Sequence, residues 1–273
     1  LSKTENLRLR EGLHLMELHD KHVNLQGFQQ SQRYLFAVHN KINRLDISQL
    51  VLSYSQPLIR RYFTMITEYR YQSQFKNKQI HPRQRYYTRP DTIQKLIAPE
   101  PSFSVANSGE IHGGQWDTEA EDFDEYRIYH SLKKRFERGW EWDRTRQLEH
   151  AKQLIRSGES CWHGCSSMQD LRSRCSYLDD LYKTIKENGY TPQSELTVDR
   201  GENASFYPPT LREISVAVGR DGDLVLLDGR HRLSIAKILD IDQIPIQIAV
   251  VHAEWDGGLP EDVSHRKSHS ATN

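Results

Sequence analysis

The sequence predicts an α+β fold in which helical N-terminal and middle regions lead into a small mixed sheet. Two observations carry this prediction. In several segments before residue 189, apolar residues recur every three or four positions, which is the spacing of one buried helix face. From residue 214 onward, short apolar runs are separated by glycine-containing turns, a pattern typical of strands.

The length of 273 residues suits one large domain or two small ones. We divide the chain into four segments by these patterns. They are a helical N-terminal extension (1–80), a loop and helical region packed on the core (81–176), a domain containing the sheet (177–256) and a flexible tail (257–273).

Two helices are expected in the N-terminal extension, with Pro57 in the first turn of the second. Residues 72–85 are polar and basic and are interpreted as a linker. The expected buried faces are Tyr34, Val38, Ile42 and Leu45 for the first helix, and Leu58, Tyr62, Met65, Ile66 and Tyr69 for the second.

The middle region is expected to be mostly helical. A short helix is predicted near 92–97, and the stretch 102–118 is interpreted as an ordered loop. Longer helices are predicted at 123–142, 145–157 and 168–189, the last of them ended by Gly189.

The C-terminal part changes to strands. The expected elements are a hairpin of strands 214–218 and 224–227 joined by a turn at 220–223, then a helix at 231–239 and a last strand at 244–251.

The formal net charge of zero hides an asymmetry. Residues 1–100 carry 16 Lys and Arg against 8 Asp and Glu, so the remainder carries a net charge of −8. A basic first third favours either contact with nucleic acid through residues 1–90 or docking on the acidic remainder. No apolar run reaches the length of a membrane span, no secretory signal is recognisable, and three cysteines are too few for a disulfide scaffold. We therefore expect a cytoplasmic protein with reduced thiols.

The most informative stretch is Asp228-Gly229-Arg230-His231-Arg232, which lies between an apolar strand and a helix. Gly229 permits a sharp turn, and the first amides of the helix have no internal partner, so they favour an anion. The arginines suit phosphate, and His231 can donate a hydrogen bond or exchange a proton. Asp228 is predicted to hold a metal ion, act as a base on a hydroxyl or fix an arginine. The structural alternative makes Asp228 a helix cap.

About residues 177–252, which include this stretch, resemble the ParB/sulfiredoxin superfamily. The resemblance rests on Asp228-Gly229-Arg230-His231-Arg232-Leu233-x-x-Ala236-Lys237-x-Leu239-x-Ile241-x-x-Ile244-Pro245 and on Leu178-x-x-Leu181-Tyr182-x-x-Ile185-x-x-Asn188-Gly189-Tyr190 upstream. It implies the fold of that superfamily and a loop that binds nucleotide phosphates. Residues expected near the loop are Asn188, Gly189, His163 and Trp116.

Differences within the superfamily narrow the expected activity. Sulfiredoxins carry a Cys where this chain has Arg230, which argues against a sulfinic-acid reductase. Partition proteins carry Gly-Glu-Arg-Arg and a following DNA-binding domain, and the different loop of this chain argues against a partition protein. The Asp-Gly-x-x-Arg loop of free serine kinases is more similar, and it implies Asp228 as catalytic base with His231 and Arg232 binding phosphate. Candidates for a second catalytic carboxylate are Glu187, Glu195 and Glu213. From about Tyr86 to Trp255 the chain also resembles uncharacterised, largely archaeal proteins that share Gly113 to Asp117, the helix Tyr126 to Phe136 and Trp162-His163-Gly164-Cys165.

Other motifs carry weaker predictions. Cys161-x-His163-x-Cys165 with Cys175 fits the spacing of zinc sites poorly, so no metal site is predicted. Trp116, in the stretch Gly113 to Asp117, is expected to be buried, the alternative being a stacking contact with a ligand. Tyr86-Tyr87-x-Arg89 is interpreted as solvated linker, the alternative being a nucleic-acid contact.

Three functions follow from these patterns. The leading hypothesis is a protein that binds a nucleotide or a phosphorylated small molecule, and possible enzymatic forms are a phosphotransferase and a nucleotide hydrolase with catalytic Asp228 and His231. Gly229, Arg230, His231 and Arg232 would bind phosphate, with Mg²⁺ recruited largely by the phosphates. The alternatives are a nucleic-acid-binding regulator or nuclease-like protein, and a non-catalytic scaffold.

Overall fold

A computed structural model describes residues 48–75, 78, 80–98, 104–196, 207–259 and 261–264. The chain divides into two compact units, residues 1–57 and residues 58–273. The second unit contains the sheet and is described below.

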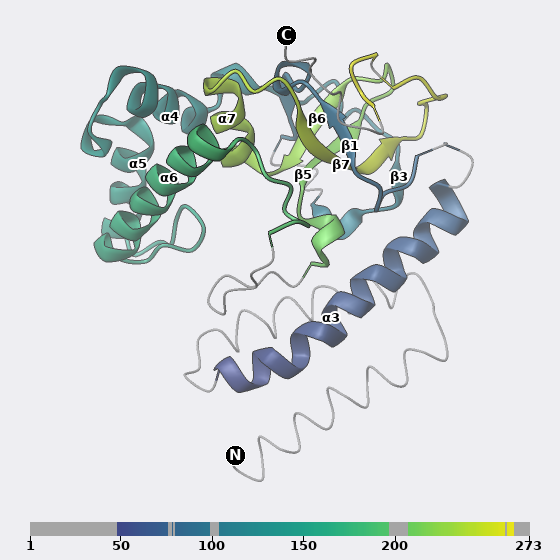
Figure 1. Ribbon diagram of the computed structural model, residues 1–273, viewed down its shortest axis with the longest axis horizontal. Coiled ribbons are helices and arrows are strands. Elements are labelled where there is room, and N and C mark those ends of the chain that lie inside the picture. Colours follow the sequence, from purple (N-terminus) through teal and green to yellow (C-terminus); the bar gives the residue numbers. More distant parts are fainter. Residues whose placement is uncertain are drawn as a thin grey trace. The chain divides into compact units, whose positions relative to one another are not determined.

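Seven strands in the described part of this unit form one mixed sheet in the order β1-β7-β5-β6-β2-β4, with β3 also paired to β7 (Figure 1). The α+β class is therefore confirmed. The strands are β1 (Tyr86–Thr88), β2 (Lys95–Leu96), β3 (Glu110–His112), β4 (Glu121–Asp122), β5 (Ile214–Val218), β6 (Leu224–Asp228) and β7 (Ile244–His252).

The central strand β7 has every residue buried, as expected for a strand flanked by partners on both sides. It pairs antiparallel with β1 and parallel with β3 and β5. Pro245, which has no N–H, lies opposite Tyr87. The backbone of Tyr87 instead exchanges hydrogen bonds of 2.8 and 2.9 Å with Ser264 on its other side.

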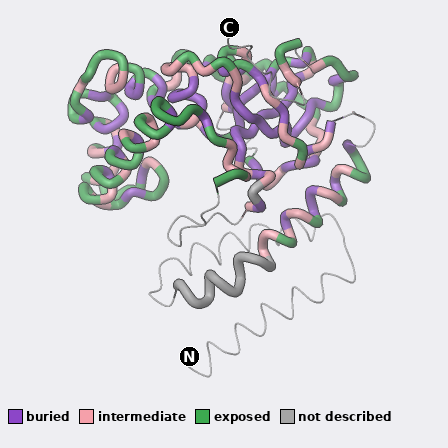
Figure 2. Tube along the Cα trace, viewed as in Figure 1, coloured by how far each residue is buried: buried purple, intermediate pink, exposed green. Residues whose placement is uncertain are grey.

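Helices α4 to α7 gather on one side of the sheet, where α7 lies between the strands and the group α4, α5 and α6 (Figure 1). Figure 2 shows the strands largely buried and the outer faces of that group exposed. The α-helices are α3 (Ser48–Arg70), α4 (Arg127–Arg138), α5 (Arg146–Arg156), α6 (Met168–Asn188) and α7 (Arg230–Ile238). A π-helical turn (Tyr71–Phe75) continues α3, and 3₁₀ turns lie at Pro90–Thr92, Val105–Asn107, Phe123–Glu125, Trp142–Arg144 and Pro209–Leu211.

Alternation along the strands divides the core between the two faces of the sheet. Leu224 and Leu226 of β6 face the cluster that also contains Leu233 of α7. Val225 and Leu227 face the other side, in a smaller cluster with Trp116. A third cluster joins α4, α5 and α6 around residues such as Leu132, Leu171 and Leu178.

The predicted C-terminal elements are confirmed within one residue at either end. The turn between β5 and β6 contains Gly222 at φ +90°, and α5 and α6 also lie where they were predicted. The predicted helix at 123–142 divides into a 3₁₀ turn, α4 and a second 3₁₀ turn, because Gly139 ends α4 in a left-handed conformation.

Two predictions before residue 118 are wrong, and a third is incomplete. The stretch 72–85 is not a linker, because the exposures of Phe75 and Ile80 are 0% and 2%. The stretch 92–97 is not a helix, since β2 forms there and pairs in parallel with β6. The loop 102–118 is ordered as expected, but it also contains β3. Four strands thus come from residues before the predicted 177–256 segment.

The buried face of α3 is rotated relative to the prediction. Ile66 is buried as predicted, but Met65 and Tyr69 are 53% and 48% exposed. Other buried side chains of this helix are Phe63, Thr67 and Arg70. The buried Arg70 guanidinium lies 2.5 Å from the Glu110 carboxylate on β3, and this ion pair offsets part of the cost of burying its charge. Pro57 lies inside α3 rather than in a first turn. The first predicted helix, with Tyr34, Val38, Ile42 and Leu45, lies outside the described residues.

The beginning of the predicted tail is packed, which the tail prediction missed. Leu259 and Val263 lie against the core, and Ser264 pairs with Tyr87. His265 and His269 lie outside the described residues. In the part of the chain that the structure covers, no helix combines the length and the apolar character needed to cross a bilayer.

Candidate functional site

The predicted strand–turn–helix is present where β6 ends at Asp228 and α7 begins at Arg230. Gly229 between them has φ +91°, and a Cβ there would lie 3.0 Å from Cγ1 and 3.1 Å from Cα of Ile214. The first intrahelical bond runs from Leu233 N–H to Gly229 O, so the three preceding amides have no acceptor within the helix. These amides and the helix dipole favour an anion at this end of α7.

Asp228 does not cap these amides. Its Oδ1 accepts a hydrogen bond of 2.7 Å from the N–H of Gly229, and the first turn of α7 has no side-chain cap. The alternative in which Asp228 is the helix cap is therefore wrong. The carboxylate is exposed at the mouth of the turn, where it remains accessible to a hydroxyl or a cation.

Arg232 is directed inward and holds the loop in place. Its guanidinium donates 2.8 Å to the carbonyl of Arg212, 3.3 Å to the hydroxyl of Tyr190 and 3.5 Å to the carbonyl of Glu213. These bonds tie α7 to the segments before β5 and after α6. We therefore assign Arg232 to positioning the loop rather than to direct phosphate binding.

His231 lies in the interior, with 7% of its surface exposed. Its Nε2 accepts a 3.0 Å hydrogen bond from the indole N–H of Trp162, and its Nδ1 lies 3.2 Å from Nη2 of Arg174. Burial, and then the charge of Arg174, hold the pKa of His231 well below its ordinary value. The imidazole is consequently neutral near pH 7, which favours a hydrogen-bonding role over acid catalysis.

The aromatic contacts to His231 come from a strained turn between α5 and α6. Trp162, His163 and Gly164 have successive φ values of +38°, +64° and +81°, closed by a 2.9 Å bond from Cys161 N–H to Cys165 O. Left-handed backbone at a non-glycine residue costs about 1–3 kcal/mol and is concentrated at functional sites. The turn places the rings of Trp162 and His163 6.1 and 5.2 Å from the ring of His231.

Arg174 and a second arginine, Arg230, flank the cluster formed by His231, Trp162 and His163. Arg230 lies over the ring of Tyr126 at 5.6 Å, and Arg174 of α6 lies over the ring of Tyr177 at 5.0 Å. Nε of Arg174 is buried without a hydrogen-bond partner, and neither arginine forms an ion pair with a carboxylate among the described residues. The cluster therefore contains two guanidinium groups whose charge no local ion pair balances.

The structure brings His163 to the loop, as expected, but not the other three residues predicted near it. Asn188 and Gly189 are exposed at the end of α6, and the adjacent Tyr190 makes the contact with Arg232 instead. Trp116 lies on the opposite face of the sheet, in the cluster with Val225 and Leu227.

The candidates for a second carboxylate separate clearly. Glu187 is exposed, and Glu195 forms a 2.7 Å ion pair with Arg85. Glu213 is 2% exposed, its Oε2 has no hydrogen-bond partner in the part of the chain that the structure describes, and burial raises its pKa. It is also the candidate whose backbone contacts Arg232, so it stands behind the loop rather than at its mouth.

Sequence reasoning missed Trp162 and Arg174 as parts of the site. The sequence predicts that Trp162 packs against the core and gives Arg174 no role. The residues lie 69 and 57 positions from His231. No local spacing connects them to the loop, and a left-handed Trp-His pair is not visible in a sequence.

The stretch Gly113 to Asp117 has a structural role. Trp116 is 1% exposed, as expected, and donates 3.3 Å to the carbonyl of His112, so it does not stack on a ligand. Asp117 accepts hydrogen bonds of 2.9 and 3.0 Å from the guanidinium of Arg220, which lies in the β5–β6 turn. This ion pair holds the pKa of Asp117 far below its ordinary range, against an opposing effect of burial.

The cysteines are free and packed into the helical cluster, where burial raises the pKa of Cys175 to about 12. In the ranges that the structure covers, no three His, Cys, Asp or Glu side chains are grouped as metal ligands. In the basic segment, Tyr86 is buried in β1, and Arg70 and Arg85 form ion pairs with Glu110 and Glu195 of the acidic remainder. For these residues docking on the acidic part of the chain is favoured over a nucleic-acid contact. The linker interpretation of Tyr86-Tyr87-x-Arg89 is wrong.

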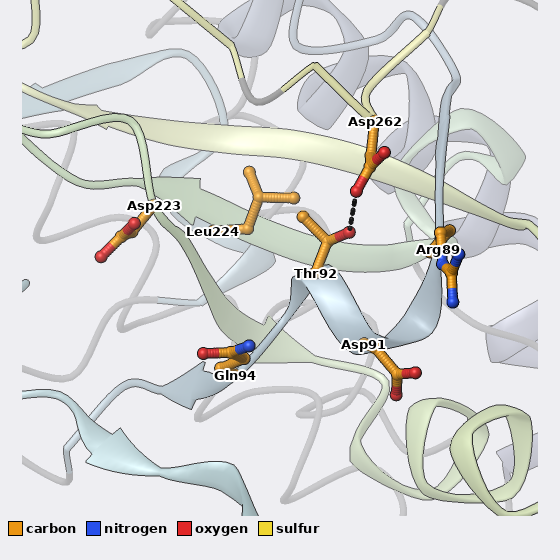
Figure 3. A pocket seen from close by; sticks show the side chains of 7 residues that line it. All are labelled: Arg89, Asp91, Thr92, Gln94, Asp223, Leu224 and Asp262. Carbon is orange, nitrogen blue, oxygen red and sulfur yellow. Dashed lines mark hydrogen bonds between the residues drawn. The ribbon is translucent and has the colours of Figure 1, made fainter.

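A hollow of about 380 Å³ lies at the opposite end of β6 from Asp228 (Figure 3). Its lining consists of Arg89, Asp91, Thr92, Gln94, Asp223, Leu224 and Asp262. With three carboxylates the hollow is chemically unlike the α7 site. The hydroxyl of Thr92 bonds Asp262 at 3.3 Å, and Lys95 bonds Asp223 at 3.0 Å.

No protein-family model, curated protein or solved structure matches this chain.

Proposed function

We propose that this protein binds the phosphate of a nucleotide or another phosphorylated small molecule at the N-terminus of α7, in a domain of the ParB/sulfiredoxin type. The observation that carries the proposal is the convergence of first-turn amides without a partner among the described residues with Arg174 and Arg230, which have no described carboxylate partner. Forked guanidinium donors and helix amides are complementary to phosphate oxygens.

The enzymatic form of the proposal is a phosphotransferase or nucleotide hydrolase centred on Asp228. The exposed carboxylate is positioned to accept the proton of an attacking hydroxyl or water, and the oxygen of that nucleophile then bonds to phosphorus as the leaving oxygen departs. Mg²⁺ would be held by the phosphates together with Asp228. His231 is assigned to binding because it is neutral and enclosed.

Calorimetric titration of ATP, CTP and inorganic phosphate with Mg²⁺ tests the proposal. Wild type is expected to bind at least one of them, and Arg230→Ala is expected to weaken that binding about tenfold or more, because a charge-assisted hydrogen bond contributes about 1.5–3 kcal/mol. Arg138→Ala, an exposed arginine on α4, is the matched control and is expected to leave binding unchanged. Absence of binding by wild type would overturn the proposal.

Asp228→Asn separates catalysis from binding. If the site is enzymatic, this variant retains nucleotide binding and loses turnover measured as phosphate release or transfer. If wild type binds nucleotide without turnover, the protein is a binding scaffold and the enzymatic form is rejected.

A further inference from the structure

We infer that the ligand enters as a doubly ionised phosphate monoester, with one oxygen bridging Nη2 of Arg174 and the Nδ1–H of a neutral His231. The inference rests on the proposed function and specifies the ionisation of its ligand and two residues that select it. Neither residue is identified as selective by the loop motif alone.

The ring of His231 has more hydrogen-bond donors around it than it can accept from. Trp162 Nε1 lies 3.0 Å from one nitrogen of His231, and Arg174 Nη2 lies 3.2 Å from the other. Indole and guanidinium groups only donate, whereas a neutral imidazole accepts at one nitrogen and donates at the other. One of the two contacts therefore brings two N–H donors together without an acceptor.

The hydrogen of the neutral His231 ring is assigned to Nδ1. Trp162 is held in the closed turn between Cys161 and Cys165, and its contact with Nε2 is the shorter of the two. Nε2 is thus the acceptor, and Nδ1 carries the hydrogen that faces Arg174. Arg174 has in addition a buried Nε without a partner. The unmatched donors are therefore on the side of the ring that faces Arg174.

These donors can be satisfied by an oxygen of a ligand. Because Nδ1 and Nη2 are 3.2 Å apart, a single oxygen can lie within hydrogen-bond distance of both. The Nε–H of Arg174, buried without a partner among the described residues, adds to the unmatched donors beside this oxygen. A ligand oxygen that carried a proton would add another donor where acceptors are lacking. A phosphate monoester with both protons removed supplies acceptors only.

The surroundings of His231 keep its ring uncharged during binding. The groups that face His231 are Arg174 from α6, Trp162 and His163 from the turn, and Arg230 and Arg232 from α7. None of them is an anion, and the Asp228 carboxylate interacts with His163. Nothing in this environment favours an imidazolium, so the pH dependence of binding belongs to the ligand.

Anion titrations with the full chain test this inference. The dissociation constants of phenyl phosphate and sulfate are measured by calorimetry between pH 5 and pH 8. Phosphate monoesters lose their second proton near pH 6, so the affinity for phenyl phosphate is expected to rise about tenfold from pH 5 to pH 7. Sulfate is a dianion throughout, and its affinity is expected to change less than twofold. Sulfate affinity that falls steeply as pH rises through 6.5 would show that a protonated histidine binds it, and this result would overturn the inference.

Variants then test the two residues. Arg174→Gln is expected to weaken phenyl phosphate binding at least tenfold, and Arg172→Gln, an exposed arginine on the same helix, less than twofold. Trp162→Phe removes the N–H that fixes the tautomer of His231 and is expected to weaken phenyl phosphate binding. Trp140→Phe is its control and is expected to leave this binding unchanged. Circular dichroism verifies folding, and the sulfate comparison needs wild type alone.

The two proposals fail in different ways. If no phosphate, nucleotide or phenyl phosphate binds to wild type, the proposed function fails. If binding requires Arg230 but survives Arg174→Gln, the proposed function stands and this inference is rejected.

Discussion

Replacing Gly229 by alanine probes the turn that creates the site. The residue has φ +91°, and a left-handed conformation costs an L-residue about 1–2 kcal/mol. The added Cβ would also lie 3.0 Å from Cγ1 and 3.1 Å from Cα of Ile214, the first residue of β5. Relief of this overlap requires movement of the backbone and adds about 1–3 kcal/mol. We therefore expect Gly229→Ala to lower the free energy of unfolding by about 2–5 kcal/mol.

Gly139→Ala is the matched control. Gly139 is also left-handed, at φ +66°, but nothing lies within 4 Å of a Cβ added there. Its expected cost is the conformational part alone, about 1–2 kcal/mol. The difference between the two variants isolates the close approach of α7 to β5.

Urea denaturation followed by circular dichroism measures both free energies of unfolding, with the slopes compared to establish that the same surface is exposed. Anion binding provides a second measurement, because displacement of Gly229 moves the first amides of α7, whereas Gly139 lies at the end of α4. Equal destabilisation by the two substitutions, together with unchanged anion binding in Gly229→Ala, would refute the reasoning.

Three further predictions concern the surrounding fold. Phe75→Ala is expected to cost about 3–5 kcal/mol in urea denaturation, because the ring is fully buried; a cost below 1 kcal/mol would restore the linker interpretation. Asp117→Asn is expected to cost about 2 kcal/mol near pH 7, since Arg220 remains partly solvated. Because the pKa of Asp117 is depressed, the difference in free energy of unfolding between wild type and Asp117→Asn should be largest above the ordinary pKa of an aspartate and should shrink on acidification. A difference that does not depend on pH would contradict the assignment. Glu213→Gln should gain stability relative to wild type as pH rises from 5 to 8, because the raised pKa of Glu213 favours its neutral form, and a constant difference would show that the buried carboxylate is fully compensated.

Much of the C-terminal fold was predictable because its signals are local. Alternation in 214–218, the turn at Gly222 and the apolar run of β7 each lie within a few residues. The short strands β1 to β4 were missed because two or three residues cannot display a period of two. They form strands because partners distant in the sequence supply their hydrogen bonds.

The sequence by itself determined the turn at Asp228 and Gly229 and the helix that follows it, because a glycine between an apolar strand and a helical pattern specifies a sharp change of backbone direction. Only the tertiary structure decided what the charged residues of that turn do. Packing directs Arg232 inward to the carbonyls before β5 and encloses His231. The same packing brings Trp162 and Arg174 to the ring from distant segments. A side chain takes its role from the donors and acceptors around it, and long-range contacts supply most of these.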